Sequence, residues 1–296
     1  MIGRLIFAAL MIPFLLGTAE SGPLKAVCST ADLAYFAGVV GGDKLTIETI
    51  ASPVSDLHYV EIRPSFVLKL KKADVAFKVG LELDMWMDKL IDGSQNGKLK
   101  VIDCSKYITP LEVPTFKADA RYGDLHRFGN PHYWLTPANV EPITRAIVEG
   151  LAQIDPANAA YYAGNRENFL RFLEGNLDSL KASAGQISGK EVIFYHNSWP
   201  YFAAFTGVVS AGFIEPYPGI SPSPSHLAKL TELIGNRRIK VIAMEPYFDR
   251  RIPDKLAADT GAKVVILYPS IGGRRAGESY LDWFIGNLNA LAEALR

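Results

Sequence analysis

Cysteine is scarce in this chain of 296 residues, which contains only two, Cys28 and Cys104. Two thiols so far apart do not make a structural zinc site, which usually needs four close ligands. Each thiol ends a different predicted strand, and buried free cysteine is common, so we favour two free thiols over a disulfide. Net charge is also absent, because 31 basic residues balance 31 acidic ones. The neutral balance gives no overall attraction to nucleic acid or anionic membranes, and no nucleic-acid partner is expected.

A hydrophobic run long enough to cross a membrane is missing as well. The N-terminal apolar run, Leu5 to Leu16, has 12 residues, whereas a membrane-spanning helix needs roughly 20. Arg4 precedes the run and Gly17-Thr18-Ala19 follows it, which is the pattern of a signal peptide over residues 1–19. A retained anchor is the less favoured alternative. No cysteine follows the run closely, so lipid attachment is not indicated, and we expect a periplasmic protein.

Short apolar, β-branched segments alternate with helical patterns through both halves of the chain. This alternation predicts parallel sheets covered by helices on both faces, an α/β fold. The predicted strands of the first half are 25–28, 44–50, 74–79 and 99–102, and those of the second half are 191–195, 208–213, 240–244 and 263–267. The helices predicted between them are 31–39, 64–71 and 82–90, then 224–235, 252–260 and 280–295. The same order of elements in both halves predicts two lobes.

A long helix is predicted between the two halves, over residues 155–184. Asp155 suits an N-cap and Pro156 the first helical position, and no proline follows as far as Ser183. An apolar stripe of helical spacing supports the helix: Phe169, Leu173, Leu177 and Leu180. There is no Gly/Ser linker, so we expect a stiff connection rather than a hinge. The predicted lobes are then residues 20–154 and 185–296.

Histidine is rare too, with five residues, of which three have similar settings. His58 follows the second predicted strand, His132 precedes a helix, and His196 directly follows a strand. Ligands of open α/β sheets gather at the carboxyl ends of the strands, so these rings can meet between the lobes. Neutral imidazole suits zinc and several other transition metals. The gaps of 74 and 64 residues contain no local motif such as HExxH, so spacing alone leaves structural roles open.

Several longer segments resemble one family, the solute-binding proteins of zinc/manganese ABC transporters. The blocks occur in family order over nearly the whole mature chain: SPVSDLHYVEIRPS, ADVAFKVGLELDMWMDKL, NPHYWLTPANV, HNSWPYFAAFTG, ISPSPSHLAKLTELI and VIAMEPYFDRRIPDKLAADTGAKVV. The resemblance implies two (βα)-type lobes with parallel sheets, joined by a long rigid helix, with a metal site in the cleft between the lobes. It also implies a monomer that delivers its ion to a membrane ABC permease.

The resemblance places His58, His132 and His196 in the three histidine ligand positions of the family. The family often has an aspartate as fourth ligand, but this chain has Tyr268 and Ser270 in that region. Water, an anion or a nearby carboxylate can take the fourth position, and Glu245 is our preferred candidate, with a structural role as the alternative. Asp56 and Glu61 are weaker candidates for orienting a histidine ring. His126 is expected to be a loop residue, with accessory metal capture as the alternative, and His226 a surface or capping residue.

Three imidazoles with at most one carboxylate favour Zn²⁺ over Mn²⁺, although manganese and iron stay possible. The expected function is capture of this ion outside the cytoplasmic membrane and delivery for uptake, without catalysis. A zinc-dependent hydrolase with Glu245 as general base is the main alternative, because three histidines and an open position also make a catalytic zinc shell. Adhesion to a partner is a third class.

Overall fold

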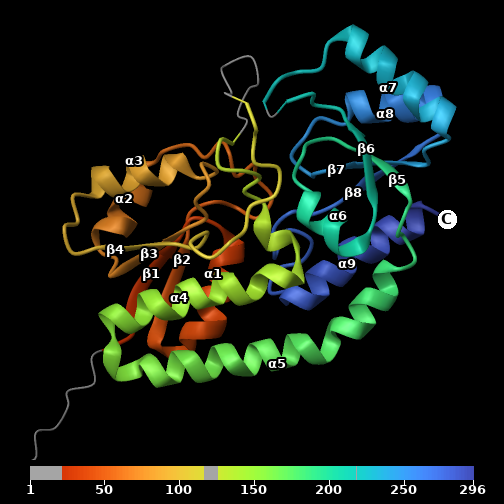
Figure 1. Cartoon of the computed structure of the whole chain (residues 1–296). Helices are drawn as coiled ribbons and strands as arrows, with labels where there is room; N and C mark the ends of the chain where they lie inside the picture. The colour runs from red at the N-terminus through yellow and green to blue at the C-terminus, as the bar shows by residue number, and fades with distance from the viewer. Residues whose placement is uncertain (1–21, 117–125, 218) are drawn as a thin grey trace, which may run out of the picture.

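The computed structural model describes residues 22–116, 126–217 and 219–296. Two four-stranded sheets form two lobes that lie side by side (Figure 1). Every pairing between neighbouring strands is parallel. The predicted α/β fold with two lobes is therefore confirmed. The predicted signal peptide, residues 1–19, lies outside the described residues.

The N-terminal sheet has the strand order β2-β1-β3-β4. Its strands are β1 (Leu24–Cys28), β2 (Leu45–Thr49), β3 (Val75–Lys78) and β4 (Lys100–Asp103). The helices α1 (Ala31–Gly41), α2 (Pro64–Lys71) and α3 (Met85–Ser94) cover it. Val75, Ala76 and Phe77 are fully buried in β3, as expected for a central strand with helices on both faces.

The C-terminal sheet repeats this arrangement with the strand order β6-β5-β7-β8. Its strands are β5 (Glu191–Phe194), β6 (Val209–Phe213), β7 (Val241–Met244) and β8 (Lys263–Ile266), and its helices are α6 (Pro200–Thr206), α7 (Pro224–Arg237), α8 (Arg251–Thr260) and α9 (Tyr280–Ala294). The sequence did not predict α6. Seven residues are too few for a clear helical period, and the helix ends at Gly207 with a φ of 73°.

The repeated strand order decides where a site can lie. In each sheet the second strand is added on one side of the first, and the later strands on the other side. Ligand sites of such sheets lie at the carboxyl ends of the strands, where the direction of winding changes. These positions are between β1 and β3 in one lobe and between β5 and β7 in the other.

Two helices link the sheets, α4 (Val140–Ile154) and α5 (Ala159–Ala184). The long helix begins a few residues later than predicted, because Pro156–Asn158 form a 3-10 turn before it. Of the predicted stripe, Leu173 and Leu180 are buried. Its 26 residues span roughly 39 Å at ~1.5 Å per residue. α5 contacts α1 and α4 at one end and α6 and α9 at the other, so it runs beneath both lobes (Figure 1).

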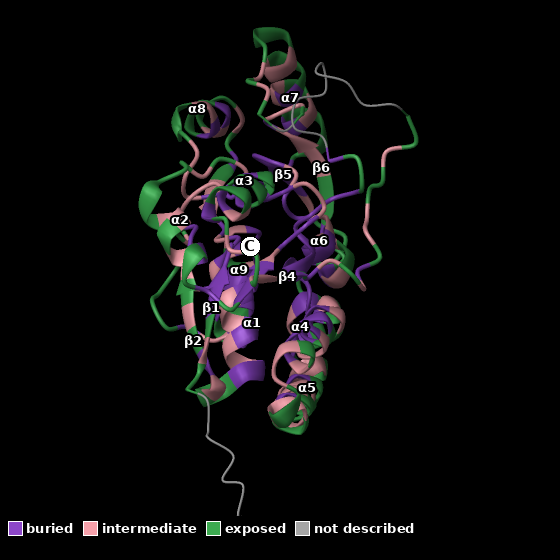
Figure 2. Ribbon diagram, turned by 90° about the vertical axis from the view of Figure 1, so that its left-hand side faces the viewer, coloured by how far each residue is buried: buried purple, intermediate pink, exposed green. Residues whose placement is uncertain are grey.

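The lobes also touch each other directly. One continuous core of buried side chains includes Val27 and Phe36 of the N-terminal lobe and Phe194 and Phe284 of the C-terminal lobe. Figure 2 shows the buried residues gathered along the sheets and the helix faces that pack on them. The boundaries at residues 154 and 184 stay predictions, since neither end of the helix interrupts this core.

Buried hydrogen bonds join the lobes through a loop that follows β8. Trp134 Nε1 donates to the carbonyl of Pro269 at 2.8 Å, and the backbone N–H of Ile271 donates to Asp32 Oδ1 at 2.9 Å. Burial raises the pKa of Asp32 to about 7, despite the hydrogen bond from Ile271. Such contacts are expensive to break, because each leaves a buried polar group without a partner.

Cys28 and Cys104 are both buried and free. Among the described residues, no helix is both long and apolar enough to cross a membrane.

Metal binding is predicted to leave the overall shape of the protein unchanged. The shared core and α5 resist a wide closure of the lobes. Small-angle X-ray scattering of metal-free and zinc-loaded protein should give the same radius of gyration within error. A large compaction on loading would contradict this.

Candidate metal site

Three of the five histidines meet between the lobes. His58 lies in the loop after β2, His132 before α4, and His196 directly after β5. One nitrogen of each ring belongs to a set whose members all lie within 4.8 Å of one another. The ring centroid of His58 lies 5.3 Å from that of His132 and 5.1 Å from that of His196. The three rings therefore lie together, as the sequence predicted. Their binding of a metal ion stays a prediction.

Two of the rings are held by the same local device. The backbone N–H of His58 lies 3.0 Å from Asp56 Oδ1, and its Nδ1 lies 2.7 Å from the same oxygen. His132 repeats this with Asn130, whose Oδ1 lies 3.1 Å from the backbone nitrogen and 3.0 Å from Nδ1. In both cases the acceptor stands two residues before the histidine. One oxygen therefore fixes both the backbone and the ring.

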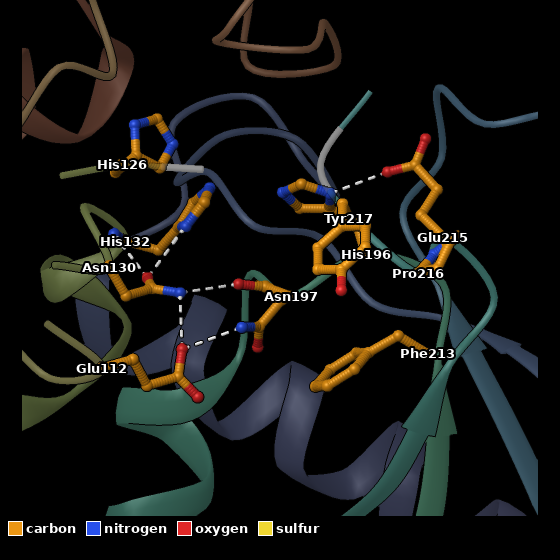
Figure 3. Close-up of a pocket in the computed structure, with 10 residues that line it drawn as sticks. All are labelled: Glu112, His126, Asn130, His132, His196, Asn197, Phe213, Glu215, Pro216 and Tyr217. Carbon is orange, nitrogen blue, oxygen red and sulfur yellow. Dashed lines mark hydrogen bonds and ion pairs between the residues drawn. The ribbon is translucent and has the colours of Figure 1, made fainter. Parts of the chain in front are cut away.

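The third ring has a partner from a neighbouring strand. Glu215 lies just beyond the carboxyl end of β6, and its Oε2 is 2.9 Å from His196 Nδ1 (Figure 3). Nδ1 of each of the three rings thus faces an oxygen acceptor and carries the proton. The Nε2 atoms keep their lone pairs and are available to an ion. This carboxylate–histidine arrangement is typical of zinc sites.

Asn130 is oriented by groups from both lobes. Its Nδ2 donates to the carbonyl of Asn197 at 2.8 Å and to Glu112 Oε2 at 3.2 Å. Asn197 Nδ2 donates to the same Glu112 oxygen at 2.8 Å. With both amide hydrogens engaged, Oδ1 of Asn130 must face His132. Glu112 itself has a positive φ of 54°, an uncommon conformation for a residue with a side chain.

The environment of His132 and His196 favours the neutral form of their rings. Burial lowers the pKa of His132 well below its usual value, and the neighbouring histidines lower it further. Burial also lowers the pKa of His196, more than the bond to Glu215 raises it. Burial would raise the pKa of Asp56, but its hydrogen bonds with His58 outweigh this and leave the pKa lowered. Neutral imidazole beside ionised carboxylate is the state that binds metal.

Glu245 is placed differently from the three histidines. It follows β7, is completely buried, and its Oε1 accepts hydrogen bonds from Ser198 Oγ at 2.7 Å and Trp199 Nε1 at 2.9 Å. Its Oε2 has no hydrogen-bond partner among the described residues. Burial raises the pKa of Glu245 to about 8. Its carboxylate does not belong to the group of ligand atoms, from His58, His132 and His196, that lie within 4.8 Å of one another. The role of Glu245 as fourth ligand stays a prediction.

The other sequence candidates have mixed outcomes. Asp56 orients a ring, whereas Glu61 is exposed and pairs with Arg63 at 2.9 Å. His226 Nε2 lies 2.9 Å from the carbonyl of Phe213, and its backbone N–H is bound by the N-cap Ser223. His126 is buried beside the site, with its Nε2 3.2 Å from His58 Nε2.

Sequence reasoning missed Glu215, Asn130 and Glu112. A signal was present for the first two. Glu215 stands at the carboxyl end of a predicted strand, where site residues of α/β sheets gather. Asn130 precedes His132 by two residues, just as Asp56 precedes His58. Glu112 lies in an irregular loop, and nothing in the sequence places it beside Asn197.

Comparison with a family model covers almost all of the described chain. Residues 26–294 match the model of the zinc-uptake complex component A, periplasmic, ZnuA. The chain belongs to the ZnuA family. Two curated relatives have low but extended identity. The chain is 24% identical over 301 residues to the zinc-binding lipoprotein AdcA of Streptococcus pneumoniae, with 98% of this chain and 60% of that protein covered. It is 26% identical over 287 residues to the iron ABC transporter substrate-binding lipoprotein MtsA of Streptococcus pyogenes, with 94% and 91% covered.

The chain thus spans about 60% of the length of AdcA. Among solved structures, a crystal structure of ZnuA superposes with a TM-score of 0.77 at 27% sequence identity, covering 92% of this chain and 97% of that one. The ZnuA fold is therefore present over both lobes.

Removal of a carboxylate beside a ring is predicted to weaken zinc binding in this ZnuA family member. Glu215→Gln or Asp56→Asn removes a negative charge and a strong acceptor, and each should lower zinc affinity by about 10- to 100-fold. A competition titration with a chromophoric chelator measures this. Glu61→Gln is the matched control, and an equal loss there would argue against ring orientation as the cause.

Proposed function

We propose that this protein captures a divalent transition-metal ion outside the cytoplasm and delivers it to an ABC permease for uptake. The convergence of three imidazoles between the two lobes supports the proposal most directly. A cavity of about 300 Å³ adjoins His132 and His196 (Figure 3), which gives room for an ion to enter. Membership of the ZnuA family supports the transport role.

Zinc is the favoured cargo. Imidazole nitrogen suits zinc, whereas manganese prefers carboxylate and water oxygen. Asp56 and Glu215 do not point their charges at the ion directly; each faces Nδ1 of a ring. Their two negative charges match the two positive charges of the ion across the rings. The relatives include proteins named for zinc and for iron, so iron and manganese are the other candidates.

Catalysis is not part of the proposal. The hydrolase alternative needs a carboxylate that accepts a proton from zinc-bound water. Glu245 is the buried carboxyl group considered for that role, but burial raises its pKa, and Ser198 and Trp199 hold its Oε1 by hydrogen bonds. We further propose that the protein acts as a monomer in the periplasm, with residues 1–19 as its signal peptide. The two relatives above are named lipoproteins.

Zinc binding should be near-stoichiometric, with one ion per chain, and should require the three histidines. His58→Ala/His196→Ala removes two of three nitrogen ligands and leaves no strong zinc shell. Isothermal titration calorimetry should then show no binding at micromolar concentrations. Unchanged binding in the double variant would overturn the proposed function, provided that its circular dichroism spectrum matches the native one.

Zinc affinity is predicted to resist mild acid. A histidine whose pKa in the folded protein is lowered stays neutral as pH falls past 6.5, the usual histidine pKa. Burial lowers the pKa of His132 and of His196, so protons compete weakly until the pH is lower still. Three histidines of ordinary pKa would each weaken binding about tenfold between pH 7.5 and 5.5. Affinity measured by chelator competition should therefore fall by no more than about tenfold over that range. A fall approaching a thousandfold would show that the rings titrate normally.

A further inference from the structure

The cavity beside the histidines has the size and the lining of a small-molecule site. Its volume is about 300 Å³, and it adjoins His132 and His196. Small-molecule sites have volumes of about 300–1,000 Å³ and combine apolar side chains with a few polar groups. The entry of an ion uses the space of this cavity but makes no use of apolar side chains in its wall.

We propose that the cavity binds a small aminocarboxylate, a molecule of the amino acid type, which completes the coordination of the captured ion. This inference rests on the proposed function, since it names a second component of the cargo at the same site. The protein then captures the ion together with an organic ligand.

The coordination shell leaves a position for an external ligand. Among the described residues, the group of ligand atoms within 4.8 Å of one another takes one nitrogen each from His58, His132 and His196, and no carboxylate. Zinc with three protein ligands takes its fourth ligand from water or a bound molecule. The region where the family resemblance implies an aspartate, residues 267–273, contains no acidic residue. Glu245 is held by two hydrogen bonds away from this role.

One wall of the cavity offers a hydrogen-bond acceptor to such a ligand. Glu112, Asn130 and Asn197 line this wall (Figure 3). Nδ2 of Asn130 and Nδ2 of Asn197 donate to Glu112 Oε2 at 3.2 and 2.8 Å. Oε1 of Glu112 takes part in neither bond, and a carboxylate oxygen only accepts hydrogen bonds. An N–H group of the ligand matches this wall, whereas a second carboxylate does not.

Another wall of the cavity is apolar and is positioned by the C-terminal sheet. Phe213, Pro216 and Tyr217 line it (Figure 3). Just beyond β6 the backbone stays bonded to β5, because the N–H of Ile214 donates to the carbonyl of Phe194 at 2.9 Å. This bond fixes the start of the wall. The aromatic rings of such a wall contact the apolar part of a ligand.

Together the ion and the two walls select one class of ligand. The ion takes an amine nitrogen or a carboxylate oxygen in its open position. A remaining N–H donates to Glu112, and the apolar side chain of the ligand lies against Phe213 and Tyr217. A purely anionic ligand such as acetate is disfavoured, because the acidic residues Glu112 and Glu215 line the same cavity and repel it.

Equilibrium dialysis of the zinc-loaded protein against radiolabelled L-histidine tests the inference, with radiolabelled acetate as the comparison. The native protein should retain a single L-histidine per chain when zinc is bound, none when zinc is absent, and no acetate. Phe213→Ala and Tyr217→Ala each remove apolar contact and should weaken retention about tenfold. Phe128→Ala removes an exposed aromatic side chain outside the cavity and should match the native protein. Chelator competition without L-histidine should give all three variants the zinc affinity of the native protein.

The outcomes separate the two proposals. No retention of L-histidine by the zinc-loaded native protein, equal retention by the metal-free protein, or removal of the zinc by L-histidine would each overturn the aminocarboxylate site alone. Native retention in both Phe213→Ala and Tyr217→Ala would overturn it as well. Absence of zinc binding by the native protein would instead overturn the proposed function. Thermal melts of the metal-free variants that match the native one exclude misfolding as the reason for weaker retention.

Discussion

The hydrogen bond at Nδ1 of each ligand-position histidine is the interaction on which the site depends. Asp56, Asn130 and Glu215 each face one Nδ1. A neutral imidazole has one nitrogen that carries a proton and one that carries a free lone pair. Because the three acceptors hold the Nδ1 protons, the lone pair of each ring is on Nε2, which is left for an ion between the lobes. Without them, three buried rings would be free to turn, and burial alone would produce a cluster of histidines but no preorganised site.

The acceptors in turn depend on contacts between the lobes. Asn130 is oriented by Glu112 and by the backbone of Asn197, and Tyr201 of α6 donates to the carbonyl of Asn130 at 2.8 Å. The site is therefore built where the two lobes already meet, above a shared core and a helix that spans both. Such an architecture suits capture with small local adjustments. It differs from binding proteins in which two domains close over a ligand by rotation about a hinge.

Much of this architecture could be predicted from the sequence, and the limits have physical causes. Apolar runs such as Val192–Tyr195 predicted strands well, since buried parallel strands need continuous hydrophobic residues. The long helix was visible because Leu173 and Leu180 repeat at helical spacing. We expected His58 and His196 to converge because both follow predicted strands, and because the family resemblance places both in ligand positions. Glu112 was beyond prediction, because its contact with Asn197 arises from tertiary packing, and the position of His126 depends on a turn around Gly129 that no periodic pattern marks.

A crystal structure of the zinc-loaded protein, with anomalous scattering recorded on both sides of the zinc edge, tests the central claim most directly. The account predicts one strong anomalous peak between the lobes, bonded to Nε2 of His58, His132 and His196, with Asp56, Asn130 and Glu215 still at the Nδ1 atoms. A peak bonded through Nδ1, or coordinated by the Asp56 or Glu215 carboxylate in place of a ring, would contradict it.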